Sequence, residues 1–460
     1  MAEESEVIAL LDEAVSSMGG QSRPGQHEMT RQVVRAMETG EHLLVQAGTG
    51  TGKSMAYLVP ALAHALGSEK PVVISTATLA LQAQIVGRDV PRLLSSLKDK
   101  LPREMEVALV KGRSNYVCQY KLNGGYPDDD EGALFSMESG TPVLGGSSEG
   151  PGSALGQEVV RLRQWAERTD SGDRDDLTPG VSDKAWRQVS VSAMDCLGAQ
   201  KCPMAAECFS ELARARAADA DVVITNHAML AVSAFEGLAV LPDFDTVIID
   251  EAHELQDRVT SSVTRPLSVN MVQTAASAAR KHCSVSVDAL NQGAKALQRA
   301  LEGVPTGLMA RGLNEDQEAA INQIAEAARV VLSDSKPEAN APADGGRQMA
   351  RSQVMYLVEQ CTKMLEMTEE REVIWASRPG HFSPGEGYVQ PDESSQPTLM
   401  VAPLSVAGKL REGLFDGRTV ILTSATLAIG AAFEPVAGSL GLVGDGAPTW
   451  NGVDVGSPFD

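Results

Sequence analysis

One run of eight residues has the composition and spacing of a phosphate-binding loop. It reads Ala47-Gly48-Thr49-Gly50-Thr51-Gly52-Lys53-Ser54. The run lies between two apolar segments, 43–45 and 55–58, an order that predicts a strand, a loop and a helix. Its glycines let successive backbone N–H groups turn toward a phosphate. The Lys53 ammonium could then reach the β- and γ-phosphates of ATP, and the Ser54 hydroxyl could bind Mg²⁺. The alternative, a glycine-rich turn without a ligand, is disfavoured by the strand and helix around it.

A pair of carboxylates, Asp250 and Glu251, is the second candidate for chemistry. The apolar run 247–249 predicts a strand that ends at this pair, and ligands of open α/β sheets bind at the carboxyl ends of strands. There Asp250 would hold Mg²⁺ through water, and Glu251 would polarise the water that attacks the γ-phosphate. We expect His253 to sense the nucleotide. Alone, such a pair could cap a helix, but a phosphate loop in the same chain favours catalysis.

Four of the six cysteines could hold a metal centre. Cys118 precedes a segment of changed composition, and Cys196, Cys202 and Cys208 follow it, with five residues between each neighbouring pair. Their polar neighbours disfavour the alternative of free thiols in an apolar core. Zinc and a 4Fe-4S cluster both accept four thiolates, although the spacing lacks the close C-x2-C pairs of zinc ribbons. The other two cysteines lie in sequence of helical character and are interpreted as ordinary thiols.

The elements that must position these residues alternate between strands and helices. Helices are expected over 5–40 and between the strands, and this alternation predicts an α/β fold with a parallel sheet. The apolar runs that predict buried strands are 43–45, 72–76, 107–111, 222–224, 247–249 and 420–423.

Two insertions interrupt the predicted sheet. The first, 117–212, contains the cysteines and a segment, 122–183, that is rich in Gly, Asp and Pro and is expected to be largely irregular and disordered. The second, 265–396, is Ala-rich and predicted to be helical. Its expected helical stretches are 272–301, 314–333 and 347–370.

Composition limits the classes of function. The net charge of −22 disfavours nucleic-acid binding through the overall field, so any such site must be a local basic track. One track combines charge with a ring for stacking, and it comprises Lys111, Arg113, Asn115 and Tyr116. The alternative for these residues is a solvated loop. Because no segment resembles a signal peptide or a membrane span, we expect a cytoplasmic protein without membrane contact.

The motifs, taken in order, resemble those of the DinG-type branch of the XPD-like superfamily 2 DNA helicases. On this resemblance Arg23 and Gln26 belong to the adenine-reading segment, and residues 46–54 are motif I. Thr76 and Thr78 belong to the motif that grips single-stranded DNA. Segments 111–118, 225–227, 250–253 and 422–427 complete the set. Within the last of these, Ser424 and Thr426 would couple hydrolysis to DNA movement.

The resemblance implies a RecA-like P-loop NTPase lobe with two inserted domains. The lobe would comprise 1–116, 213–264 and 397–455, with an iron-sulfur domain at 117–212 and a helical Arch domain at 265–396. A 4Fe-4S cluster would sit on the four cysteines. ATP hydrolysis would drive 5′-to-3′ unwinding of forked DNA during repair or at blocked replication, with nucleoid association if the protein is bacterial. The sequence does not indicate protein partners.

The family's second motor lobe would begin near 456–460, and we find no match to its last motif, a helix rich in Gln and Arg. We therefore expect a helicase lobe without unwinding activity and with little DNA-stimulated ATPase. The alternative is a module that binds nucleotide and single-stranded DNA without acting as a motor. A nuclease is disfavoured because no exonuclease domain precedes Arg23.

Overall fold

The computed structural model places the chain in two compact units, each assembled from separate stretches of sequence. Unit 1 comprises Met1–Lys111, Leu212–Ser262 and Ser405–Asp460, and unit 2 comprises Gly112–Glu211 and Val263–Leu404. The residues that the structure describes are 3–127, 154–235, 239–338, 341–368, 370–378, 381–383, 387–389 and 395–457. Residues 128–153, which are part of the segment expected to be irregular, and residues 458–460, at the expected start of the second lobe, therefore lie outside the described residues.

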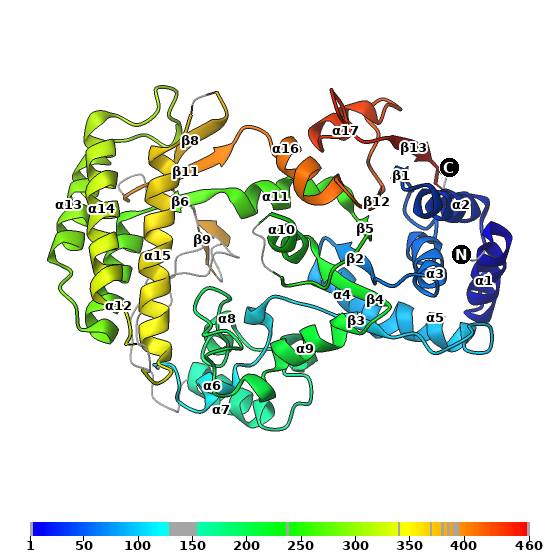
Figure 1. The fold of residues 1–460 in the computed structure, drawn as a ribbon, viewed down its shortest axis with the longest axis horizontal. Coiled ribbons are helices and arrows are strands. Elements are labelled where there is room, and N and C mark those ends of the chain that lie inside the picture. The colour runs from blue at the N-terminus through cyan, green and yellow to red at the C-terminus, as the bar shows by residue number, and fades with distance from the viewer. Residues whose placement is uncertain are drawn as a thin grey trace. The chain divides into compact units, whose positions relative to one another are not determined.

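Unit 1 is built on a seven-stranded sheet of described residues in which every neighbouring pair is parallel (Figure 1). The order is β13-β1-β12-β5-β2-β4-β3. The strands are β1 (His42–Gln46), β2 (Val72–Thr76), β3 (Val107–Leu109), β4 (Val222–Asn226), β5 (Thr246–Asp250), β12 (Thr419–Ser424) and β13 (Trp450–Asp454). This arrangement confirms the predicted α/β fold with a parallel sheet.

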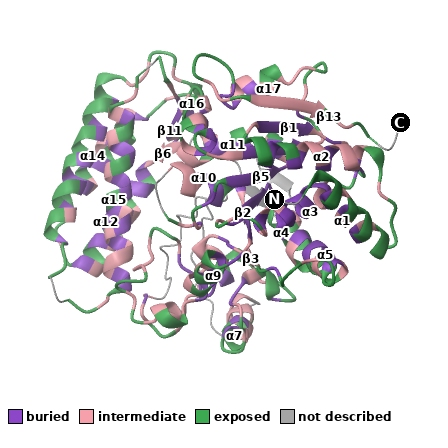
Figure 2. Ribbon diagram, turned by 45° about the vertical axis from the view of Figure 1, so that its right-hand side comes forward, coloured by how far each residue is buried: buried purple, intermediate pink, exposed green. Residues whose placement is uncertain are grey.

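Helices cover the sheet and bury its apolar strands, which Figure 2 shows as purple ribbons. The longer ones are α1 (Glu4–Ser17), α2 (Pro24–Thr39) and α3 (Lys53–Ala65). Shorter helices of the unit are α4 (Leu79–Gln84), α5 (Val90–Leu97), α10 (His227–Phe235), α16 (Ala407–Leu410) and α17 (Glu434–Ser439). Two more, α9 (Phe209–Ala218) and α11 (Leu255–Val263), have most of their residues in unit 1. Such two-sided burial is why the central strands are continuous runs of Val, Ile and Leu without alternation.

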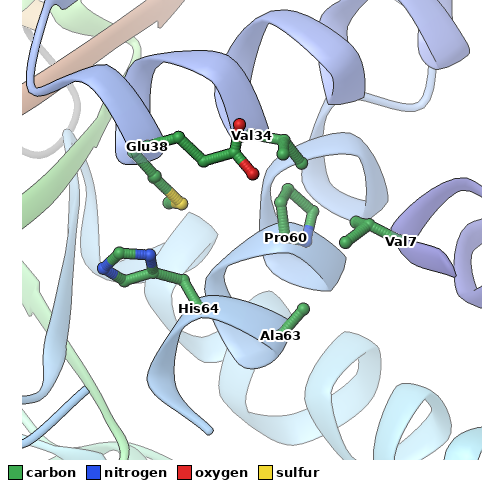
Figure 3. Close-up of a pocket in the computed structure, with 7 residues that line it drawn as sticks. Val7, Val34, Glu38, Pro60, Ala63 and His64 are labelled. Carbon is green, nitrogen blue, oxygen red and sulfur yellow. The ribbon is translucent and has the colours of Figure 1, made fainter. Parts of the chain in front are cut away.

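A proline inside α3 removes one helical hydrogen bond, and a side chain of α2 replaces the missing donor. Pro60 has no N–H, so the carbonyl of Ala56, four residues earlier, lacks its helical donor. The buried Thr30 hydroxyl of α2 donates to that carbonyl at 3.1 Å. Pro60 also faces Val34 and Val7 across a small pocket where α1, α2 and α3 meet (Figure 3). The hydrogen bond therefore joins two helices that flank the phosphate loop.

We expect Thr30→Val to destabilise the protein by about 1–3 kcal/mol, because the isosteric side chain leaves the Ala56 carbonyl buried without a donor. The midpoint of urea unfolding, measured at equal protein concentration, would report the loss. Thr39→Val is a matched control, since the Thr39 hydroxyl bonds the Arg35 carbonyl at an exposed position of the same helix. Equal shifts in the two variants would contradict the role given to Thr30.

The second half of unit 2 is a helical bundle with a small sheet. The helices are α12 (Val269–Cys283), α13 (Asp288–Ala300), α14 (Glu315–Asp334) and α15 (Gly345–Leu365). Side-chain caps at Ser268, Asn314 and Asp344 begin three of them. The sheet, four-stranded among the described residues, is antiparallel and was not expected. Its strands are β6 (Arg265–Leu267), β11 (Thr398–Pro403), β8 (Glu372–Ser377) and β7 (Gly307–Leu308), and β9 (His381–Ser383) pairs with β10 (Gly387–Val389).

The first half of unit 2 carries the cysteines on short elements. These are α6 (Gln119–Leu122), α7 (Ala154–Ala166) and α8 (Asp183–Trp186), with 3-10 turns at Arg113–Asn115, Arg174–Asp176 and Ala205–Glu207. Long-range backbone hydrogen bonds from Val117 to Gly172 (2.9 Å) and from Cys118 to Val189 (2.7 Å) hold the segment together. Across the described residues, no helix is both long and apolar enough to span a bilayer.

Candidate active site

The predicted phosphate loop connects β1 to α3 and depends on glycine geometry. Gly50 and Gly52 have left-handed backbone angles, with φ of 79° and 85°. A Cβ atom at Gly52 would also lie 2.5 Å from the Gln26 amide nitrogen. Lys53 is the first residue of α3, so the loop ends at a helix N-terminus, where backbone N–H groups are free to bind an anion.

The N-terminus of α2 holds the loop from one side. Gln26 is buried and donates from its amide to the Gly52 carbonyl at 3.1 Å. The Arg23 guanidinium donates to the Gly50 carbonyl. Both residues that the resemblance assigns to adenine reading therefore lie against the phosphate loop.

The Glu251 side chain, at the end of β5, contacts residues of the motifs that follow or end the neighbouring strands β1 and β12. Its Oε1 atom lies 3.0 Å from the Lys53 Nζ atom, and its Oε2 atom accepts a hydrogen bond of 3.2 Å from the Ser424 hydroxyl. The His253 Nδ1 atom lies 2.8 Å from the same hydroxyl. Glu251 has a left-handed backbone, with φ of 54°, which is uncommon for a residue other than glycine. Thr426 is exposed, and its backbone N–H bonds the Ser424 hydroxyl at 3.3 Å.

Asp250 is buried beside Tyr57, a residue that the sequence analysis did not select. The Tyr57 hydroxyl donates to the Asp250 carboxylate at 2.9 Å, and Ser54 also lies within its hydrogen-bonding reach. Burial raises the pKa of Asp250, and the nearby Lys53 charge opposes that shift. Burial, and then the Asp250 charge, raises the pKa of Tyr57, so its hydroxyl keeps its proton. The available signal was the spacing of Tyr57, one helical turn after Lys53.

Ser54 and Asp250 fit the expected Mg²⁺ site in their chemistry. A hydroxyl and a carboxylate are oxygen ligands of the kind that Mg²⁺ prefers, and Tyr57 contacts both.

The two threonines expected to grip DNA differ in exposure. Thr76 ends β2 with a fully buried side chain, whose hydroxyl lies 3.3 Å from the Thr78 carbonyl. Thr78 is exposed and caps α4 by accepting from the Leu81 N–H at 3.2 Å. Thr78 therefore offers the more accessible side chain of this pair.

The expected basic track is more buried than its composition suggests. Lys111 and Tyr116 are only 2% and 5% exposed. Arg113 forms an ion pair with Glu211, and the Asn115 amide donates to the Gly112 carbonyl at 3.2 Å. Charged and aromatic side chains were expected to face solvent here, but tertiary packing covers most of their surface.

The four selected cysteines, Cys118, Cys196, Cys202 and Cys208, line one cavity in unit 2, together with Arg113 and Glu211. Burial raises the pKa of the Cys118 thiol to about 11, and the other three thiols add to that rise. The Gly198 N–H points at the Cys196 sulfur at 3.4 Å. In the described ranges, no three His, Cys, Asp or Glu side chains are close enough together to hold a single metal ion.

Comparison with known proteins places the chain among helicases. Residues 27–114 match the family model described as DEAD/DEAH box helicase. The chain is 42% identical to the ATP-dependent helicase DinG of Mycobacterium tuberculosis, over 98% of this chain and 66% of that protein. It is 37% identical to the ATP-dependent DNA helicase YoaA of Escherichia coli, over 54% of this chain and 36% of that protein.

A solved structure titled XPD_Helicase aligns with a TM-score of 0.48 and 14% identity, over 94% of this chain and 62% of that chain. The assignment to a family rests on the sequence relatives. The chain spans slightly less than two thirds of the length of its mycobacterial relative. The chain belongs to the DinG-type family of DEAD/DEAH-box helicases.

Proposed function

We propose that this chain binds and hydrolyses ATP as part of a DNA helicase that moves 5′ to 3′ along single-stranded DNA. The observation that carries the proposal is the meeting of Lys53, Glu251 and Ser424, which joins the phosphate loop, the acidic motif and the Ser-Ala-Thr motif in one place. The names of the relatives, an ATP-dependent helicase and an ATP-dependent DNA helicase, support the same activity.

The contacts suggest how the residues divide the work. Nucleotide phosphates would compete with Glu251 for the Lys53 ammonium and so release the carboxylate to polarise the attacking water. Ser54 and Asp250 would hold Mg²⁺, which neutralises charge on the phosphates when bound. His253 and Ser424 both contact the Glu251 carboxylate. They would therefore sense whether that carboxylate is paired with Lys53 or is free to bind the attacking water.

We further propose that Cys118, Cys196, Cys202 and Cys208 hold a 4Fe-4S cluster. Their location around one cavity supports this proposal, because four thiolates are the usual ligand set of such a cluster. We propose the same domain assignment as the sequence predicts, with an iron-sulfur domain at 117–212 and an Arch domain at 265–396.

For DNA, we propose single-stranded and forked substrates held without regard to sequence. The turn Thr76–Thr78 is the favoured contact in unit 1, since Thr78 is exposed at a helix N-terminus where backbone N–H groups suit a phosphate. The track at Lys111, Arg113, Asn115 and Tyr116 remains a second proposed contact.

The proposed function is tested by measuring two affinities of the purified chain, for Mg-ATPγS and for a labelled oligothymidylate. We expect each ligand to bind and to change the affinity for the other by the same factor, about fivefold or more. Binding of the oligonucleotide should weaken as salt rises, because phosphate contacts release counterions. The proposal would be contradicted if the chain bound neither ligand, or if it bound a blunt duplex as tightly as the oligothymidylate.

A further inference from the structure

The motif Thr225-Asn226-His227 has no role in the function proposed so far, yet its side chains are closely held. The Thr225 hydroxyl donates to the Val110 carbonyl at 2.9 Å. The Asn226 side chain accepts from the Met229 N–H at 2.9 Å and thereby caps α10. These two contacts fix the backbone on either side of the β4–α10 junction, so they also fix the position from which His227 projects.

His227 is completely buried and lies against β2. Its Nδ1 atom is 2.7 Å from the Ser75 hydroxyl. Ser75 pairs in register with Thr225 on one side and with Ile249 on the other, so β2 separates the strand before His227 from the strand that carries Asp250. The imidazole therefore lies beside a strand that directly adjoins the acidic motif.

The other ring nitrogen of His227 has no partner of its own among the residues that the structure describes. Its Nε2 atom is buried and makes no well-formed hydrogen bond within the described part of the chain. Burial lowers the pKa of His227 to about 4, while the main chain of Glu251 and, more weakly, that of Asp250 favour the protonated ring. The ring is therefore neutral at physiological pH, and the main chain of the acidic motif lies within electrostatic reach of it.

The two segments that meet His227 are those that matter for the proposed motor. On one side, Glu251 has a left-handed backbone, a conformation that persists only where the surroundings enforce it, and it holds Lys53 and Ser424. On the other side, Ser75 directly precedes Thr76, and Thr78 follows two residues later. His227 thus contacts the strand that leads into the proposed DNA segment, and that strand pairs directly with the strand that carries the acidic motif.

We propose that His227 is a positioning residue that ties the Asp250–Glu251 turn to β2 and so couples the nucleotide site to the segment Thr76–Thr78. This inference rests on the proposed function. A nucleotide that draws Lys53 away from Glu251 would alter the support of that strained turn, and His227 would pass the change to Ser75.

The test compares His227→Phe with His227→Gln. Phenylalanine keeps the planar ring but has no nitrogen, whereas glutamine loses the ring but keeps a polar amide. For each variant, the affinity for Mg-ATPγS is measured with and without oligothymidylate. We expect the wild-type coupling of about fivefold or more to fall close to onefold in His227→Phe and to be partly retained in His227→Gln. If His227 served only to fill space, the ring of His227→Phe would preserve more of the coupling than the amide of His227→Gln.

Two further variants keep the test decisive. Ser75→Ala removes the partner hydroxyl, and it should reduce coupling without adding to the effect of His227→Phe in the double variant. His64→Phe, at a partly buried histidine in α3, is the matched control and should couple like the wild type.

The outcomes separate the inference from the proposed function. A wild-type chain that binds neither ligand would overturn both. A wild-type chain that binds both ligands without coupling would contradict the coupling expected of the proposed function and would also overturn the role of His227. A folded His227→Phe variant that couples normally would overturn only the role of His227. If His227→Phe does not fold, His227→Gln and Ser75→Ala decide the question by the same measurement.

Discussion

Lys53→Ala is expected to weaken Mg-ATP binding by about 30-fold or more, a loss of 2 kcal/mol or greater, whereas Glu251→Gln should bind ATP as well as the wild type. The difference follows from the proposed roles. Lys53 contacts phosphates that are present in the ground state, while Glu251 acts on the water that attacks during the reaction. Glu251 also pairs with Lys53 at 3.0 Å, so its neutralisation removes a competitor for the phosphates.

Calorimetric titration with Mg-ATPγS would measure both affinities, and a single-turnover assay would show whether Glu251→Gln slows hydrolysis. Lys70→Ala provides a matched control, because Lys70 pairs with Asp243 and Asp245 at the surface of the same unit. An equal loss of affinity in Lys53→Ala and Glu251→Gln would refute this division of roles.

Protein purified without oxygen is expected to be brown and to carry about four iron atoms per chain, and Cys202→Ser should lose most of that iron. The same substitution should make the cysteine segment sensitive to protease, since a segment held by short helices and turns depends on its metal for stability. Iron analysis, visible absorption and limited proteolysis would measure these effects.

Cys283→Ser is the control for the cysteine experiment. Cys283 lies at the end of α12 and is not among the residues that line the cavity of Cys118, Cys196, Cys202 and Cys208, so this variant should keep its iron. Stoichiometric zinc without visible absorption in the wild type would exclude the iron-sulfur proposal while leaving the four-thiolate site in place.

Features carried by neighbouring residues could be predicted from the sequence. The predicted phosphate loop is such a feature, because the glycines that shape its backbone and the side chains of Lys53 and Ser54 lie within eight consecutive residues. The parallel sheet is another such feature. Strands that are buried on both faces consist of short continuous runs of apolar residues, such as 247–249, which can be found in the sequence. The antiparallel sheet of unit 2 left no comparable signal, because β6 and β7 have three and two residues and pair with distant segments.

Tertiary structure decided which of the distant groups meet and which of them are accessible. Glu251 contacts Lys53 from 198 positions away and Ser424 from 173, so neither contact is visible in local sequence. Burial is likewise a property of the surroundings. Lys111 and Arg113 have the chemistry of an exposed basic track, yet packing leaves Lys111 almost without surface and pairs Arg113 with Glu211. The sequence by itself was enough to select the groups that we propose to bind ATP and a metal, because that chemistry belongs to side chains and short loops. The fold showed that Tyr57 contacts Asp250 and that His227 contacts Ser75, because these partners come from other strands.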